Sequence, residues 1–161
     1  MLYTLSILVD NQAGVLTRVT SLIARRGFNI ESLAVGVTEN PTLSRITLVV
    51  DADARSVEQI SKQLNKLINV HKVSDLTDES RTDRELALFK VSTTPERRHE
   101  IIEMCDVFRA NIVDVGRNTL TIEATGDESK LAAMEGLFRE YGIREVARTG
   151  RISLARGGAR D

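Results

Sequence analysis

One short segment of the chain carries residue types that suit a small charged ligand. It lies between an expected strand and an expected helix and reads Asn11, Gln12, Ala13, Gly14, Val15, Leu16. The first turn of a helix leaves backbone N–H groups unpaired, and their partial positive charge attracts a carboxylate. Gly14 has no Cβ, so a ligand can come close to its backbone.

The same segment offers groups for the rest of an amino acid. Side-chain amide and carbonyl oxygens, with Asn11 foremost, suit an ammonium group, and Val15 and Leu16 would form a small apolar wall. The segment therefore predicts a receptor for a small apolar amino acid. Strand-to-helix turns also contain Asn and Gly for backbone reasons alone, so an ordinary turn is the alternative.

Other residues of reactive types lack the neighbours that catalysis or metal binding would require. His71 falls in an expected strand and His99 in an expected helix, and neither has a Ser or Cys nucleophile in a recognisable context beside it. Cys105 shares an apolar helical face, which is typical of a core residue. Asp51 and Asp53 resemble a metal-binding pair, but they lack further ligands and precede a helix that acids would cap. We predict no catalytic residue and no metal site.

A strand and a helix must position the ligand-binding segment. Residues 3–9 alternate apolar and polar side chains, as a half-buried strand does. The apolar residues from Val15 to Ile23 recur on one helical face, and Gly27 ends that helix. The rest of the first half predicts strands at 29–37, 46–50 and 70–73 and a helix over 57–67.

The second half of the chain repeats this order. Val9 and Asn29 have counterparts at Val91 and Asn111, and the stripe Val57, Ile60, Leu64, Leu67 maps onto Leu131, Met134, Phe138, Tyr141. This repeat predicts an α+β protein of two tandem ferredoxin-like βαββαβ units. The polar linker 76–85 divides it into domains 1–76 and 77–161, and we expect residues 157–161 to be mobile.

The second copy of the ligand-binding segment lacks the features that suit a carboxylate. Thr93 replaces Asn11, and Glu96 replaces Gly14, where its charge would repel an incoming carboxylate. Pro95 is expected to start a helix. We expect the first unit to sense a ligand and the second to contact another surface.

The composition excludes several classes of protein. The net charge is −1, without the basic surplus of a nucleic-acid binder. A single cysteine cannot form an intrachain disulfide, which fits a reducing compartment. The N-terminus does not read as a signal peptide, and no apolar run is long enough to cross a bilayer, so we expect a cytoplasmic protein.

Several motifs resemble one known family. The stretch Leu5–Leu33 resembles the opening of an ACT domain, and more narrowly the regulatory subunit of acetolactate synthase, also called acetohydroxyacid synthase. Arg26–Leu33 (RGFNIESL) is similar to that family's RG(F/Y)NIESL signature, and Pro41–Arg45 (PTLSR) to its hairpin motif. Gln63–Leu67 and Glu145–Gly150 also fit, so the likeness covers nearly the whole chain.

This resemblance implies a regulatory subunit and not an enzyme. The family's small subunits carry no catalytic groups and bind the large catalytic subunit, which holds thiamine diphosphate, magnesium and usually FAD. That subunit condenses pyruvate with a second 2-oxo acid in branched-chain amino-acid biosynthesis. The small subunit raises its activity and makes it sensitive to feedback inhibition, most often by valine.

The resemblance also implies where the binding surfaces lie. The ACT domain, residues 1–76, would sense the effector and form a homodimer, with the site between two chains. One chain would supply Asn11–Leu16 and its partner Asn29 and Ile30. The hairpin Thr38–Arg45 is our candidate for contact with the catalytic subunit through Pro41, Thr42, Leu43, Ser44 and Arg45, and an ordinary solvated hairpin is the alternative.

Three other functions are alternatives to this one. An ACT-domain amino-acid sensor for a different metabolic enzyme is the main alternative, because the turn alone does not name its client. RNA-recognition domains share the βαββαβ order but need aromatic residues on their middle strands, and the strand at 44–50 has none. A small ferredoxin-like enzyme would need a paired acid, base or nucleophile.

Overall fold

The computed structural model describes residues 1–157 and divides into two units. The first unit is Met1–Thr82 together with the chain from Arg151 onward, and the second is Asp83–Gly150. Mobility was predicted for residues 157–161, and residues 158–161 of that range lie outside the described part.

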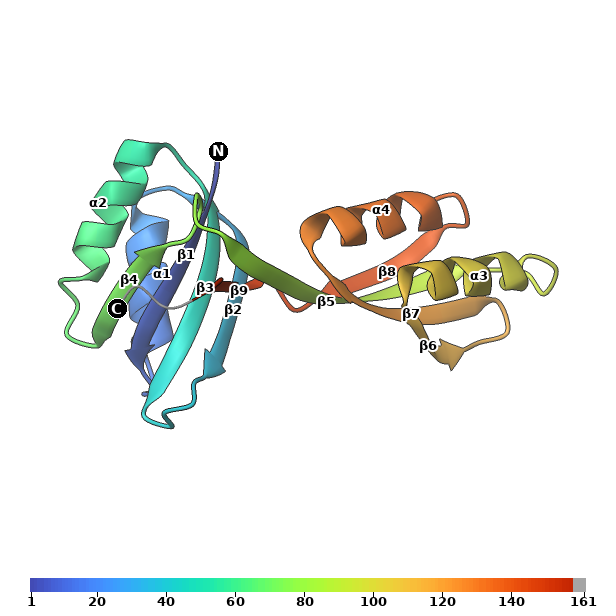
Figure 1. Ribbon diagram of the computed structural model, residues 1–161, viewed down its shortest axis with the longest axis horizontal. Helices are drawn as coiled ribbons and strands as arrows, with labels where there is room; N and C mark the ends of the chain where they lie inside the picture. The colour runs from blue at the N-terminus through green and yellow to red at the C-terminus, as the bar shows by residue number, and fades with distance from the viewer. Residues whose placement is uncertain (158–161) are drawn as a thin grey trace. The chain divides into compact units, whose positions relative to one another are not determined.

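The first unit is a four-stranded antiparallel sheet with two helices on one face (Figure 1). Its strand order is β2-β3-β1-β4, so β2 is an edge strand of this sheet. In chain order its elements are β1 (Leu2–Asp10), α1 (Val15–Arg25), β2 (Asn29–Val37), β3 (Leu43–Asp51), α2 (Ala54–Leu64) and β4 (Val70–Asp75).

Alternation along β1 and β3 creates the apolar core of this unit. Leu5 and Ile7 are fully buried on the face that the helices cover, and α1 buries its apolar stripe against them. Complete burial of each such side chain contributes about 1.5–3 kcal/mol. The opposite, helix-free face carries small polar side chains, among them Thr4 and Ser6.

The ends of the two helices follow from single residues. Gly27, with a φ of 75°, terminates α1 because its N–H reaches the carbonyl of Ala24 in a left-handed conformation that favours glycine. Asp53 begins α2, where its carboxylate accepts a hydrogen bond of 2.8 Å from the N–H of Ser56. Asp51 pairs instead with the N-terminal ammonium at 2.7 Å.

The second unit repeats the arrangement with strand order β6-β7-β5-β8, which confirms the predicted tandem fold. The helix α4 buries Leu131, Met134 and Phe138, the counterparts of the buried residues on α2. Its elements are β5 (Arg81–Ser92), α3 (Arg98–Phe108), β6 (Asn111–Val115), β7 (Thr119–Gly126), α4 (Glu128–Phe138) and β8 (Ile143–Arg148).

The start of α3 and the extent of the two units differ from the sequence expectation. Helix α3 begins at Arg98 and not at Pro95, because Pro95 lies in a turn that the N–H of Arg97 closes onto the carbonyl of Thr94. The expected second domain was 77–161, whereas the second unit is Asp83–Gly150 and residues 151–157 belong to the first unit.

The returning C-terminal segment forms a short strand, β9 (Ile152–Ala155), which pairs with β5. The backbone N–H of Arg151 donates to the hydroxyl of Ser32 at 2.8 Å, and that of Arg156 donates to the carbonyl of Ser80. Ser153 is buried. The small hydroxyl residues of the helix-free face therefore provide the seat for β9.

Candidate functional site

The turn between β1 and α1 is open at the point where a ligand was expected. Gly14 precedes the helix with a φ of 84°, and no atom lies within 4 Å of the position that a Cβ would take there. Among residues 1–157, no side chain caps the first turn of α1. The helix therefore presents the electropositive end of its backbone dipole to an exposed surface.

Each unit has a second helix, α2 or α4, which follows a β-hairpin. The first turn of each of these helices is capped by the side chain of its N-cap residue. Asp53 caps α2, and Asp127 caps α4 by accepting from the N–H of Lys130 at 2.9 Å. These carboxylates occupy the place that an external carboxylate would take at α1. The start of α1 is thus chemically suited to an anion that none of residues 1–157 supplies.

The predicted apolar wall is narrower than expected. Val15 is 3% exposed because it belongs to the core, whereas Leu16 is 39% exposed. Asn11, Gln12 and Ala13 are exposed as well. In this chain, Leu16 is the side chain of the segment that offers apolar surface to a ligand.

Asn11 ties the turn to the β2–β3 hairpin. Its backbone N–H donates to the carbonyl of Thr42 at 2.8 Å, and its Nδ2 donates to the carbonyl of Pro41 at 3.1 Å. The amide oxygen of Asn11 then remains as an acceptor for an ammonium group. One side chain can thus bridge a ligand and the hairpin.

The two predicted parts of the effector site lie at opposite ends of the sheet in one chain. Asn29 pairs across β3 with Asp51, which pairs with Leu2 at the start of β1. The turn follows Asp10, at the other end of β1, eight residues or about 26 Å away at the usual rise of a strand. Asn29 and Ile30 can meet the turn only if they come from a second chain.

The hairpin between β2 and β3 is held by several internal hydrogen bonds. Asn40 Oδ1 accepts hydrogen bonds from both the N–H and the hydroxyl of Thr42, at 3.0 and 2.7 Å. The hydroxyl of Thr38 donates to the carbonyl of Asn40, and the N–H of Thr38 donates to the carbonyl of Leu43. These hydrogen bonds fix the conformation of the hairpin tip.

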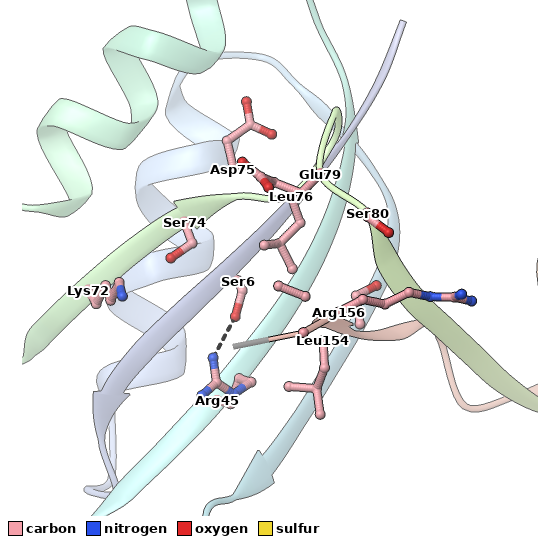
Figure 2. A pocket seen from close by; sticks show the side chains of 13 residues that line it. Ser6, Arg45, Lys72, Ser74, Asp75, Leu76, Glu79, Ser80, Leu154 and Arg156 are labelled. Atoms are coloured by element: carbon pink, nitrogen blue, oxygen red, sulfur yellow. Dashed lines mark hydrogen bonds between the residues drawn. The ribbon is translucent and has the colours of Figure 1, made fainter. Parts of the chain in front are cut away.

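The five predicted contact residues of the hairpin point in different directions. Pro41 and Thr42 are exposed at its tip, and Leu43 is half-buried at the start of β3. Ser44 is 6% exposed and does not offer its side chain to a partner. Arg45 lies on the helix-free face, where its Nη1 donates to the hydroxyl of Ser6 at 2.8 Å (Figure 2).

Comparison with known proteins identifies the family. Residues 5–72 match the model of the AHAS small subunit-like ACT domain, and residues 84–157 match that of the small subunit of acetolactate synthase. A probable acetolactate synthase small subunit from Archaeoglobus fulgidus is 55% identical over 157 residues, which cover 98% of each chain. The chain belongs to the acetolactate synthase small-subunit family.

Further relatives agree over almost the full length. An acetolactate synthase small subunit from Mycolicibacterium smegmatis is 52% identical over 155 residues, covering 96% of this chain and 91% of that protein. The crystal structure of the acetolactate synthase small subunit from Thermotoga maritima superposes with a TM-score of 0.88 at 41% identity, covering 99% of both chains. The family resemblance read from the motifs is thereby confirmed.

The second unit of this acetolactate synthase small-subunit homologue has no side-chain cap at the equivalent helix α3 either, but it places an acidic side chain, Glu100, in the first turn of that helix. Arg97 stacks on the ring of Tyr141, 4.4 Å from its centroid, and the Tyr141 hydroxyl donates to Glu100 at 2.8 Å. These bonds lower the pKa of Glu100, chiefly through the Tyr141 hydroxyl, and raise that of Tyr141. Thr93 bonds its neighbour's carbonyl and does not reach a hairpin tip through its side chain.

His71 and Cys105, for which no catalytic role was predicted, have structural roles. His71 Nε2 contacts Asp10 Oδ1 at 2.5 Å, and Cys105 is 2% exposed in the second core. Burial raises the pKa of the Cys105 thiol to about 11. Within residues 1–157 there is no grouping of three or more His, Cys, Asp or Glu suited to a metal, and no helix long and apolar enough to cross a membrane.

Sequence reasoning missed two features beside the turn. The bond from Asn11 to Pro41 joins residues 30 apart, yet it follows from the antiparallel pairing that sets Asp10 opposite Leu43. The loop before β4 is also tied to the turn, because the N–H of Asp10 donates to the carbonyl of Asn69 at 2.9 Å. No local spacing in the sequence signals that second bond.

Proposed function

We propose that this chain is a non-catalytic regulatory subunit that binds the acetolactate synthase catalytic subunit, raises its activity and makes it sensitive to inhibition by valine. The observation that carries the proposal is the uncapped, exposed start of α1 at Gly14, beside an amide oxygen of Asn11. Thiamine diphosphate, magnesium and FAD would belong to the catalytic partner.

Valine matches the chemistry of this turn group by group. Its carboxylate would accept from the first N–H groups of α1, since an anion is stabilised at a helix N-terminus. Its ammonium would donate to the Asn11 amide oxygen and to neighbouring carbonyls of Gln12 and Ala13. Its short branched side chain would pack against Leu16.

A homodimer would complete the site. Two β2 edge strands that pair antiparallel about a twofold axis would bring the Asn29 end of one chain beside the Val37 end of the other. Val35 and Val37, 46% and 60% exposed, supply apolar surface for that pairing. Asn29 and Ile30 of one chain would then approach the turn of its partner.

The hydrogen bonds of Asn11 offer a direct route from effector to catalytic subunit. A ligand that engages the Asn11 amide also bears on the carbonyls of Pro41 and Thr42, at the tip of the proposed docking hairpin. An effector can shift an equilibrium only by its differential affinity for the two states. Coupling of about 1–3 kcal/mol would change activity by about 5- to 150-fold.

Reconstitution with the catalytic subunit of the same organism tests this function. We expect acetolactate formation to rise and saturate as the small subunit is added, and valine to inhibit only when it is present. Pull-down from a lysate should recover a thiamine-diphosphate enzyme. Recovery of a different metabolic enzyme, with no effect on acetolactate formation, would support an ACT-domain sensor for another client and refute the proposal.

A further inference from the structure

The helix-free face of the first unit contains a groove that shares only Arg45 with the predicted sites. It encloses about 500 Å³ beside β9. The hydroxyls of Ser6 and Ser74 form its floor, the segment Ser153–Gly157 forms one wall, and Arg45 and Lys72 stand at the end nearer the hairpin (Figure 2). We call this space the β9 groove.

The strand register sets the two cations of the β9 groove on either side of one residue. Arg45 and Lys72 both pair with Leu8 of β1, from β3 and β4 respectively. Their backbones are therefore two strand spacings apart, or about 10 Å. Side chains as long as those of Arg and Lys can converge over that distance on one acidic group.

Neither cation has an ion-pair partner among the described residues. Arg45 donates to the neutral hydroxyl of Ser6, and Lys72 is exposed. The acidic residues of the β9 groove, Asp75 and Glu79, lie away from Arg45 in Figure 2, and Asp75 is engaged by the N–H and hydroxyl of Thr77. The charge of the two cations at the hairpin end is therefore uncompensated.

We propose that the β9 groove receives an acidic segment of the acetolactate synthase catalytic subunit. The inference rests on the proposed function and extends the docking surface from the hairpin tip onto the sheet. Arg45 is the residue common to both, because it belongs to the hairpin motif and projects its guanidinium into the groove. Leu154, 62% exposed on the wall, adds apolar contact beside the charges.

A protein segment fits this space better than a lone anion. About 500 Å³ is far larger than one small ion needs, and the mixture of hydroxyl floor, cations and exposed Leu154 resembles a recognition surface. The unpaired Arg45 and Lys72 decide the sign of the segment's charge. Opposite charges across an interface steer association and fix its register.

Lys72→Glu tests the inference, with Lys66→Glu as the matched control. Lys72 is exposed and unpaired, so its reversal leaves the core intact, and Lys66 is an exposed lysine outside the β9 groove. The readout is the small-subunit concentration that half-activates the catalytic subunit. We expect Lys72→Glu to raise it about ten-fold or more, Lys66→Glu to leave it unchanged, and Lys72→Arg to preserve it.

Two further measurements, the effect of ionic strength and the binding of inorganic phosphate, can contradict the inference. The effect of Lys72→Glu should shrink at high ionic strength, because salt screens exposed charge pairs. Equal titration curves for the Lys72 and Lys66 variants would overturn the inference. The inference would also be overturned if Lys72→Glu left the activation curve unchanged but abolished binding of inorganic phosphate to the free subunit. The groove would then be a site for a small anion. Failure of the unaltered chain to activate would refute the proposed function itself.

Discussion

Replacement of Gly14 by aspartate should abolish inhibition by valine and spare activation. The new carboxylate would occupy the uncapped start of α1, where the carboxylate of valine is proposed to bind. A Cβ at this position meets no atom within 4 Å, so the first atom of the new side chain has room. The left-handed backbone at a φ of 84° costs an L-residue about 1–2 kcal/mol.

The energetic balance leaves the fold intact and removes the ligand. An acidic residue at a helix N-terminus recovers about 0.3–1 kcal/mol of the backbone cost, and native domains have about 5–15 kcal/mol of stability. A hydrogen bond to a charged group contributes about 1.5–3 kcal/mol, so loss of one such bond weakens valine binding about 10- to 150-fold. Repulsion between the two carboxylates adds to that loss.

The assay compares valine titrations of the reconstituted enzyme with calorimetry of valine binding to the small subunit. Gly142→Asp is the matched control, because Gly142 has a φ of 100° and lies in the second unit, where a Cβ would make only ordinary contact with Ser92. We expect the control to keep normal inhibition. Unchanged valine inhibition of the Gly14→Asp enzyme would refute the assignment of the effector turn.

Three further predictions test the hairpin, a helix cap and the second core. Asn40→Ala removes the acceptor that holds Thr42, so it should raise the small-subunit concentration needed for activation of the catalytic subunit. Calorimetry should find the affinity for valine within about two-fold of normal. An activation curve equal to that of the unaltered chain would contradict the docking role of the hairpin. Asp53→Ala should lower the melting temperature at neutral pH. Because its hydrogen bonds from Ser56 lower the pKa of Asp53, this difference should vanish as pH falls through that lowered pKa, and a gap that persisted in acid would argue against the cap. Burial raises the pKa of the Cys105 thiol from 9.0 to about 11, so Cys105 should resist thiol reagents at neutral pH until the chain unfolds. The stability of the fold should decrease between pH 9 and about 11, because the thiol ionises in the unfolded chain before it does in the folded one. Rapid labelling of the native chain would refute the burial.

Much of the fold was predictable because the information is local. The apolar stripes of α1 and α2 each report one buried face, and the alternation in β1 reports the face that the helices cover. The alternation did not predict that Thr4 and Ser6, on the other face of β1, are buried as well. The repeat followed from the same spacing, since Val57, Ile60 and Leu64 and their counterparts Leu131, Met134 and Phe138 are buried in both units. The bounds of β2 were predicted without error.

Parts of the candidate site depended on contacts between distant residues. Whether a helix start is open depends on side chains: Asp53 closes α2, while no described residue closes α1. The sequence near Arg45 suggested a hairpin tip, but strand alternation turns its guanidinium onto the helix-free face. Ser44, its neighbour, is turned inward for the same reason.

The sequence by itself determined the order of elements, the tandem repeat, the glycine at the start of α1 and the family, because each is written in short-range spacing or in contiguous motifs. Only the tertiary structure decided that Asn11 holds the hairpin, that Asn29 lies at the far end of the sheet from the turn, and that β9 returns to the first unit. Those three facts depend on strand pairing between residues far apart in the chain, and pairing is chosen by the burial of the whole sheet and not by any single segment.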